Sequence, residues 1–146
     1  MLTFMDRRLY RILGGIVVVA VLMLSRGVID SLDIHFYYTA DFVTDFFSNL
    51  SADQARRYLQ QEVLDLVFLL LYSGAFFLLL KRFFGTWKWL AVAGGLFDFI
   101  ETFSVILCLE GLVSPEQLGW LGVVTALKWI SVVVILLLLI RRATRR

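Results

Sequence analysis

Four long apolar segments divide the chain, and they constrain its fold more than any other feature. They cover about residues 11–25, 63–80, 87–109 and 118–140. A helix needs about 20 residues to cross a bilayer, and with their flanking residues the segments give spans at 9–26, 60–81, 87–109 and 116–140. The hydrophobic content of 60% also exceeds the roughly 45–50% of soluble domains. The sequence therefore predicts an all-α fold, a four-helix transmembrane bundle in one domain, residues 1–146.

The first segment is the shortest, and a cleaved signal peptide is the alternative to a span. Three arginines precede or begin it, and its apolar stretch, residues 12–24, has the length of a signal-peptide h-region. However, Arg26 follows directly and no A-x-A-like cleavage site is present. We therefore retain the segment as a span, in which Arg26 reaches the interface through its long side chain.

The basic residues indicate how these spans are oriented. With four spans, ten basic residues fall on one side: Arg7, Arg8, Arg11, Lys81, Arg82, Lys88, Arg141, Arg142, Arg145 and Arg146. Arg26, Arg56 and Arg57 fall on the other side. Because cytoplasmic loops carry the excess of Lys and Arg, the pattern predicts a multi-pass protein of the cell membrane. We expect a prokaryotic inner or plasma membrane, with both termini in the cytoplasm.

The one long connection, residues 27–59, lies on the outer side in this arrangement. Thr39 is a candidate N-cap for a short amphipathic helix, whose apolar face carries Phe42, Val43, Phe46, Phe47 and Leu50. We expect this short helix to lie along the outer interface or to cover the mouth of the bundle.

Capping signals mark other helix ends. Residues 51–54 (SADQ) and 114–117 (SPEQ) have the form of capping boxes, and the first suggests that the second span begins early. Gly85 followed by Thr86 predicts a helix stop and a new N-cap between the second and third spans. These two spans are therefore expected to form a tight hairpin.

The scarcity of cysteine and histidine excludes several classes of site. Cys108 is the one cysteine and His35 the one histidine. The chain therefore has no internal disulfide, CxxC redox pair, cysteine-based metal site or histidine cluster. It also lacks a phosphate-binding loop and a serine nucleophile elbow. We expect no metal site, no cofactor and no nucleic-acid partner.

Three charged side chains fall close to the middle of the membrane. At a rise of about 1.5 Å per residue, Asp98, Glu101 and Lys128 lie roughly 15, 20 and 18 Å from the cytoplasmic edge of a core about 30 Å thick. A charge at this depth costs about 2.5–3.5 kcal/mol on insertion scales, so we expect an ion pair between the third and fourth spans. Gly94 and Gly95, about one turn earlier, permit close helix approach.

The charges of this group do not balance. Asp98 and Glu101 are three residues apart and share one side of a helix, but only Lys128 opposes them. One of the two carboxyl groups is therefore expected to hold a proton or to meet a cationic or hydrogen-bonding ligand. Thr102 and Thr125 are candidate hydroxyl partners.

A second polar group is expected nearer the outer side. Glu62, Asp65 and Tyr72 share one face of the second span with Tyr58. Arg26, at the end of the first span, is the expected partner of Asp65. We expect the two groups together to line a polar ligand cavity open to the outside, with Asp65 and Tyr72 along its entrance.

Two interpretations of the midplane charges stay open. Ionisable residues within membrane spans are functional-site candidates by default, but an ion pair can also serve as an assembly lock that sets the register of two helices. The surplus acid favours a working site, because a pure lock needs only one acid for each base.

Four different short motifs are spread along most of the chain. They are Tyr38-Thr39, Leu64-Asp65-Leu66 with Tyr72, Asp98 to Glu101, and Leu127-Lys128-Trp129. Together they resemble a group of uncharacterised prokaryotic four-span integral membrane proteins, although an Asn commonly follows the Glu in that group where this chain has Thr102. The architecture is also similar to the emopamil-binding, EXPERA-type proteins. The members of that family that isomerise sterols use an intramembrane histidine, which these spans lack, so the resemblance implies a four-span bundle and lipid binding.

The sequence thus predicts an integral membrane protein whose intramembrane charged site binds a lipid-like or apolar amine-bearing ligand. Acid–base chemistry on that ligand is a further expectation, with Asp98 and Glu101 as proton donor and acceptor and Lys128 keeping one of them ionised. The alternatives are an accessory or assembly subunit, whose buried charges specify helix pairing within a complex, and proton-coupled transport by an oligomer. The expected partners are membrane lipids and, under the alternatives, another membrane protein or a second copy.

Overall fold

The regular structure of the chain is helical wherever it is described. The computed structural model describes residues 7–25 and 31–144. These residues contain no strand, and their long helices are α1 (Arg7–Ser25), α3 (Ala52–Phe84), α4 (Lys88–Leu109) and α5 (Leu121–Thr144). The predicted all-α fold is confirmed.

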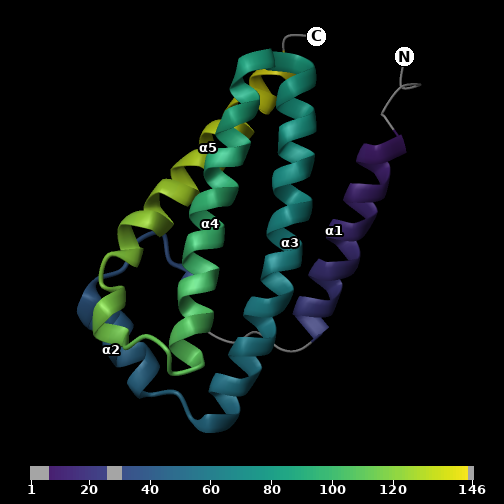
Figure 1. Ribbon diagram of the computed structural model, residues 1–146. Helices are drawn as coiled ribbons and strands as arrows, with labels where there is room; N and C mark the ends of the chain where they lie inside the picture. Colours follow the sequence, from purple (N-terminus) through teal and green to yellow (C-terminus); the bar gives the residue numbers. More distant parts are fainter. Residues whose placement is uncertain (1–6, 26–30, 145–146) are drawn as a thin grey trace.

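The described helices include continuous apolar runs of the kind found in membrane proteins. Three runs within the described residues are long and apolar enough to cross a membrane: Arg7–Ser25, Ala52–Leu109 and Pro115–Thr144. The middle run contains a sharp turn, the 3-10 helix η2 (Gly85–Trp87), which folds α4 back against α3 (Figure 1). The predicted hairpin of the second and third spans is therefore present.

The turn of this hairpin was only partly predicted. Gly85 has a φ of 58°, which favours glycine, and it ends α3 as expected. The predicted N-cap at Thr86 is wrong, because Thr86 lies inside η2. The N-cap residue of α4 is Trp87, which makes no side-chain capping bond.

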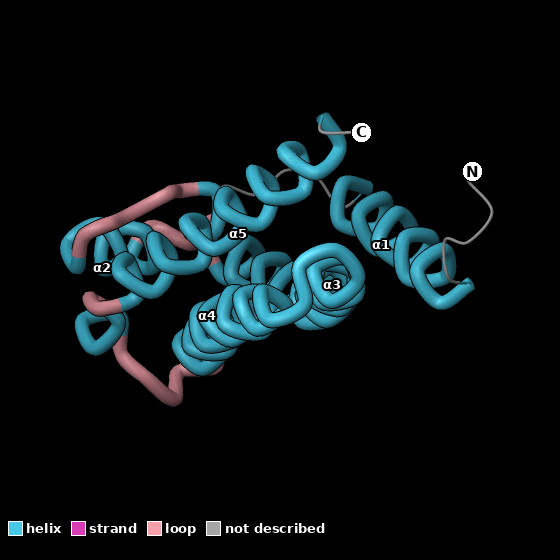
Figure 2. Tube along the Cα trace, turned by 90° about the horizontal axis from the view of Figure 1, so that it is seen from above, coloured by secondary structure: helices cyan, strands magenta, loops and turns pink. Residues whose placement is uncertain are grey.

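α4 packs against both α3 and α5 and lies between them in the view of Figure 1. α1 packs mainly on α3, away from α4 (Figure 2), and Gly15 lies close to Leu71 there. The start of α1, the η2 turn and the end of α5 lie at one end of the molecule, which we name the hairpin end (Figure 1). The opposite end, the cap end, carries α2 (Ala40–Ser48) and the 3-10 helix η3 (Pro115–Leu118).

Two helix starts differ from the predicted span bounds. Ser51 and Gln54 form a reciprocal capping box, so α3 begins at Ala52 rather than near residue 60. The early start therefore follows from the capping signal in the sequence. The second box also forms, but it begins η3, and α5 starts only at Leu121 rather than at residue 116.

Residues 31–50, which we name the cap segment, fold over the cap end of the bundle. Thr39 Oγ1 accepts a hydrogen bond from Phe42 N, which confirms the predicted N-cap of α2. α2 packs against η3, and the missing side chain of Gly122 leaves room for the backbone of Tyr38. Of the two predicted positions for this short helix, the structure supports the one that covers the bundle mouth.

Two apolar cores lie at the two ends of the bundle, and a polar layer separates them. The cap core consists of buried Leu32, Tyr38, Val43, Tyr58, Val105, Cys108, Leu118 and Leu121. The hairpin core consists of buried Leu80, Ala91 and Ile135. Between them, α4 and α5 contribute the buried side chains of the polar layer: Asp98, Glu101, Thr102, Thr125 and Lys128.

Candidate functional site

Two glycines bring the helices around the polar layer close together. A Cβ at Gly94 would lie 3.1 Å from Ser131 Cβ on α5, and one at Gly95 would stand 3.0 Å from Ser73 Cβ on α3 and closer still to its hydroxyl. The two glycines therefore face different neighbours, which confirms their expected role in helix approach. Asp98 follows one turn later on the same helix and is held at this narrow junction.

Lys128 connects the two carboxylates of α4. Its Nζ lies 3.1 Å from Asp98 Oδ1 and 2.5 Å from Glu101 Oε2. All three side chains are at most 7% exposed. The predicted ion pair between these two helices is confirmed, and a single ammonium group serves both acids.

Glu101 is fully buried and is contacted from three directions. Besides Lys128, Tyr38 OH donates to Glu101 Oε1 at 2.9 Å, and the Thr125 hydroxyl lies within hydrogen-bond distance of the same oxygen. The two hydroxyl oxygens are themselves 3.0 Å apart. Thr125 is thus a hydroxyl partner, as predicted, and Glu101 ties α4 to both α5 and the cap segment.

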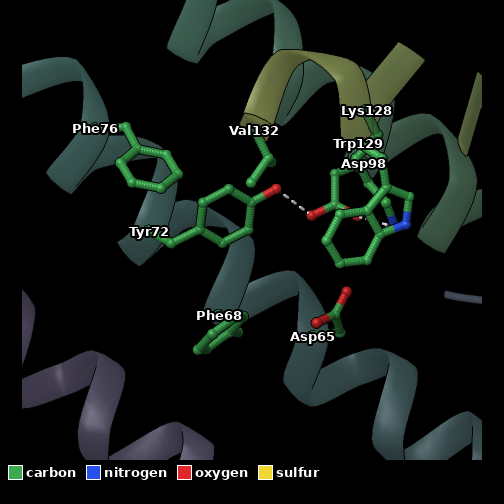
Figure 3. A pocket seen from close by; sticks show the side chains of 8 residues that line it. All are labelled: Asp65, Phe68, Tyr72, Phe76, Asp98, Lys128, Trp129 and Val132. Atoms are coloured by element: carbon green, nitrogen blue, oxygen red, sulfur yellow. Dashed lines mark hydrogen bonds and ion pairs between the residues drawn. The ribbon is translucent and has the colours of Figure 1, made fainter. Parts of the chain in front are cut away.

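Asp98 has a different environment because it faces a pocket. Tyr72 OH donates to Asp98 Oδ2, while Lys128 approaches the other oxygen (Figure 3). Of the two acids, Asp98 lines the pocket and Glu101 does not. The structure therefore separates two carboxylates that the sequence treated alike: Glu101 connects elements of the fold, and Asp98 borders an open space.

The pocket lies between α3 and α5 and has a volume of about 320 Å³. Its lining combines charged and aromatic side chains: Asp65, Phe68, Tyr72, Phe76, Asp98, Lys128, Trp129 and Val132 (Figure 3). Asp98 and Lys128 are buried, whereas the other six are half-buried, so the pocket is partly open. Asp65, Tyr72, Asp98 and Lys128 of the two predicted polar groups thus line a pocket, but most of its lining surface is apolar rather than polar.

The structure divides the second predicted polar group. Asp65 and Tyr72 line the pocket, whereas Glu62 is 1% exposed and does not line it. Thr102 was expected beside the midplane acids but donates to Asp65 Oδ2 at 3.1 Å instead. Arg26, the predicted partner of Asp65, lies outside the described residues.

Two important side chains were not singled out as site residues in the sequence. Tyr38 reaches the polar layer from a connection 63 residues before Glu101, while the neighbouring Tyr37 is 57% exposed. Trp129 forms one wall of the pocket, and Lys128 Nζ lies 5.8 Å from the centroid of its ring. Two features of the sequence could have indicated these side chains. Gly122 permits a close backbone approach, and Trp129 is adjacent to an intramembrane lysine.

No group of three His, Cys, Asp or Glu side chains suited to hold a metal ion occurs in the part of the chain that the structure describes. No protein-family model, curated protein or solved structure matches the chain. Its function is therefore inferred from the polar layer and the pocket.

Proposed function

We propose that the protein crosses a prokaryotic cell membrane four times, through α1, α3, α4 and α5, with both termini in the cytoplasm. The apolar helical runs support this topology. The hairpin end carries the basic residues at the start of α1, at the end of α3, at the start of α4 and at the end of α5, and it faces the cytoplasm, which agrees with the positive-inside rule. The polar layer then lies near the middle of the bilayer, between the two apolar cores.

We infer that the pocket binds a lipid-like or apolar amine-bearing ligand. The observation that carries this proposal is that aromatic walls and the carboxylate of Asp98 meet in one pocket. Its volume of about 320 Å³ falls within the roughly 300–1,000 Å³ of small-molecule sites. In the proposed topology its open side faces hydrocarbon, so an apolar ligand enters directly from the lipid.

The charges around the pocket favour an amine on that ligand. The carboxylates of Asp65 and Asp98 both line the pocket, beside the ammonium group of Lys128. These carboxylates attract a ligand ammonium at close range. Aromatic ring faces also attract cations, with contributions of about 0.5–2 kcal/mol each. The pocket therefore suits a cationic head group on an apolar body.

Acid–base chemistry on the ligand is the finer part of the proposal. Asp98 is the candidate for proton transfer because its carboxylate borders the pocket and contacts both Tyr72 and Lys128. Glu101 does not reach the pocket, so we assign it the role of holding Lys128 beside Asp98. This assignment narrows the predicted pair of proton-transferring acids to a single one.

The assembly-subunit alternative receives less support from the geometry. Both ion pairs of Lys128 are formed within one chain, so these charges do not require a helix from another protein. The pocket beside these charges has a role in a ligand site. It has no role if the ion pairs only set the register of the helices.

Native mass spectrometry of the purified protein tests the ligand proposal. We expect a small amine-bearing apolar molecule to accompany the wild type, and to be lost in Asp98→Asn and Trp129→Leu. Trp120→Leu is the matched control, because Trp120 directly precedes α5, the helix that carries Trp129, but does not line the pocket. Dodecylamine is expected to raise the thermal midpoint of the wild type, and dodecanol of equal chain length is not.

Two results would contradict this proposal. The first is equal binding of the small molecule, or equal stabilisation by dodecylamine, in the folded Asp98→Asn, Trp129→Leu and Trp120→Leu variants. The second is a protein that co-purifies at fixed stoichiometry while neither a small molecule nor dodecylamine binds, which favours the assembly subunit.

A further inference from the structure

The hairpin end concentrates positive charge without a carboxylate among its described residues. Residues 7–11, 76–92 and 132–144 contain no Asp or Glu. Their basic side chains are Arg7, Arg8, Arg11, Lys81, Arg82, Lys88, Arg141 and Arg142. Together these basic side chains give the surface a positive potential, which attracts anions.

Two of these arginines come from different helices and converge on one aromatic ring. Arg82 Cζ of α3 lies 5.6 Å from the centroid of the Phe83 ring, and Arg142 Cζ of α5 lies 5.9 Å from it. Both distances are within the range of cation–π contact. Arginines from α3 and α5 therefore both lie beside the ring of Phe83.

Guanidinium groups beside a ring can still bind an anion. Each carries a planar fork of N–H donors, and the attraction to a ring does not itself need a hydrogen bond from them. Those donors match the oxygens of a phosphate, often in pairs. A phosphate at this place is attracted by the charges of both arginines.

The surroundings indicate that the phosphate belongs to a lipid. Large apolar side chains are exposed beside the basic residues: Trp89 is 63% exposed, Leu137 60% and Ile140 58%. A soluble anion leaves these surfaces uncovered, whereas acyl chains cover them. Tryptophan and basic side chains together are also typical of the membrane–water interface.

We propose that Arg82, Arg142 and Phe83 form a binding site for the phosphate of an anionic phospholipid in the leaflet at the hairpin end. The site is separated from the pocket by the hairpin core. It does not depend on the ligand proposed for the pocket, and it joins the end of α3 to the end of α5 through a bound lipid.

Lipid titration of the purified full-length chain in detergent tests this proposal, with native mass spectrometry as the measurement. Phosphatidylglycerol is the probe and phosphatidylcholine the zwitterionic comparison. We expect Arg82→Gln and Arg142→Gln each to weaken phosphatidylglycerol binding about tenfold, as the loss of one charged hydrogen-bond contact predicts. Phe83→Leu keeps both charges but no longer holds the guanidinium groups, so it should weaken binding as well.

Lys81→Gln and Arg141→Gln are the matched controls. Each removes one charge from a position next to Arg82 or Arg142, but neither is one of the two side chains described above beside the Phe83 ring. We expect them to change phosphatidylglycerol binding less than about twofold, as weak, screened surface charges do. Equal losses in the controls and the site variants would show general attraction between charges and overturn the proposal.

Two further outcomes would also overturn it. One is equal binding of phosphatidylglycerol and phosphatidylcholine by the wild type. The other concerns the source of the phosphate: saturable stabilisation by inorganic phosphate alone, in the absence of lipid and abolished by Arg82→Gln, would assign the site to a soluble anion.

Discussion

Replacement of Gly122 by alanine is expected to detach the cap segment from the polar layer. An added Cβ would overlap the carbonyl oxygen of Tyr38 and stand 3.0 Å from its carbonyl carbon. The obstacle is backbone, which cannot rotate away as a flexible side chain can. The cap segment must therefore withdraw by on the order of 1 Å or more to recover ordinary packing distances.

That withdrawal breaks the hydrogen bonds of Tyr38. Its hydroxyl oxygen is 2.9 Å from Glu101 Oε1 and 3.0 Å from Thr125 Oγ1, and about 1 Å more places both beyond hydrogen-bond distance. A hydrogen bond to a charged group contributes about 1.5–3 kcal/mol. With some loss of packing in the cap core, we expect Gly122→Ala to lower the free energy of unfolding by about 2–4 kcal/mol.

Unfolding in mixed micelles, monitored to equilibrium, measures this difference. Gly74→Ala is the matched control, because a Cβ at this helical glycine meets nothing within 4 Å. It should be neutral or stabilising by up to about 1 kcal/mol. Tyr38→Phe then tests whether the loss arises from the Tyr38 hydroxyl. It should lower the free energy of unfolding less in the Gly122→Ala background than in the wild type. Equal stability of the two glycine variants, or full additivity with Tyr38→Phe, would refute the reasoning.

Three further predictions use the same unfolding assay or hydrogen exchange. Lys128→Met leaves two buried carboxylates without their cation and should cost about 3–5 kcal/mol; adding Glu101→Gln should recover part of this, and no recovery would argue against the pairing. Gly95→Ala directs a Cβ into the Ser73 side chain and should cost about 1–3 kcal/mol. Ser73→Ala should partly rescue it, because the hydroxyl is the nearest obstacle. Thr39→Ala removes the N-cap of α2 and should cost about 1 kcal/mol, seen as faster amide exchange in α2; unchanged exchange would contradict the capping role.

The features that the sequence predicts well depend either on neighbouring residues or on position along a helix axis. The capping box at Ser51 and the stop at Gly85 are set by neighbouring residues, so they could be predicted without knowledge of packing. The contact of Lys128 with Asp98 and Glu101 could be predicted from depth, because a residue count along each helix gives its height in the bilayer. Height alone is sufficient to bring opposite charges on adjacent helices together.

A residue count gives the height of a side chain along its helix, but it does not give the direction in which the side chain points around the helix axis. Asp98, Glu101 and Thr102 all lie on the buried side of α4, but successive residues differ by about 100° around an α-helix. Small differences in direction therefore decide that Asp98 meets the pocket and that Thr102 turns to Asp65 on α3. Those directions depend on how α3 and α5 pack on α4, which is a property of the folded structure.

The contact of Tyr38 with the polar layer is harder still to predict, because it joins a connection to the interior of the bundle. Through Glu101, Lys128 and Asp98, one continuous set of hydrogen bonds and ion pairs runs from Tyr38 in the cap segment to Tyr72 at the pocket. The one ammonium group in this network serves both acids, so its position depends on both carboxylates. The cap segment is therefore part of the support of the pocket wall, although the sequence places it outside the four predicted spans.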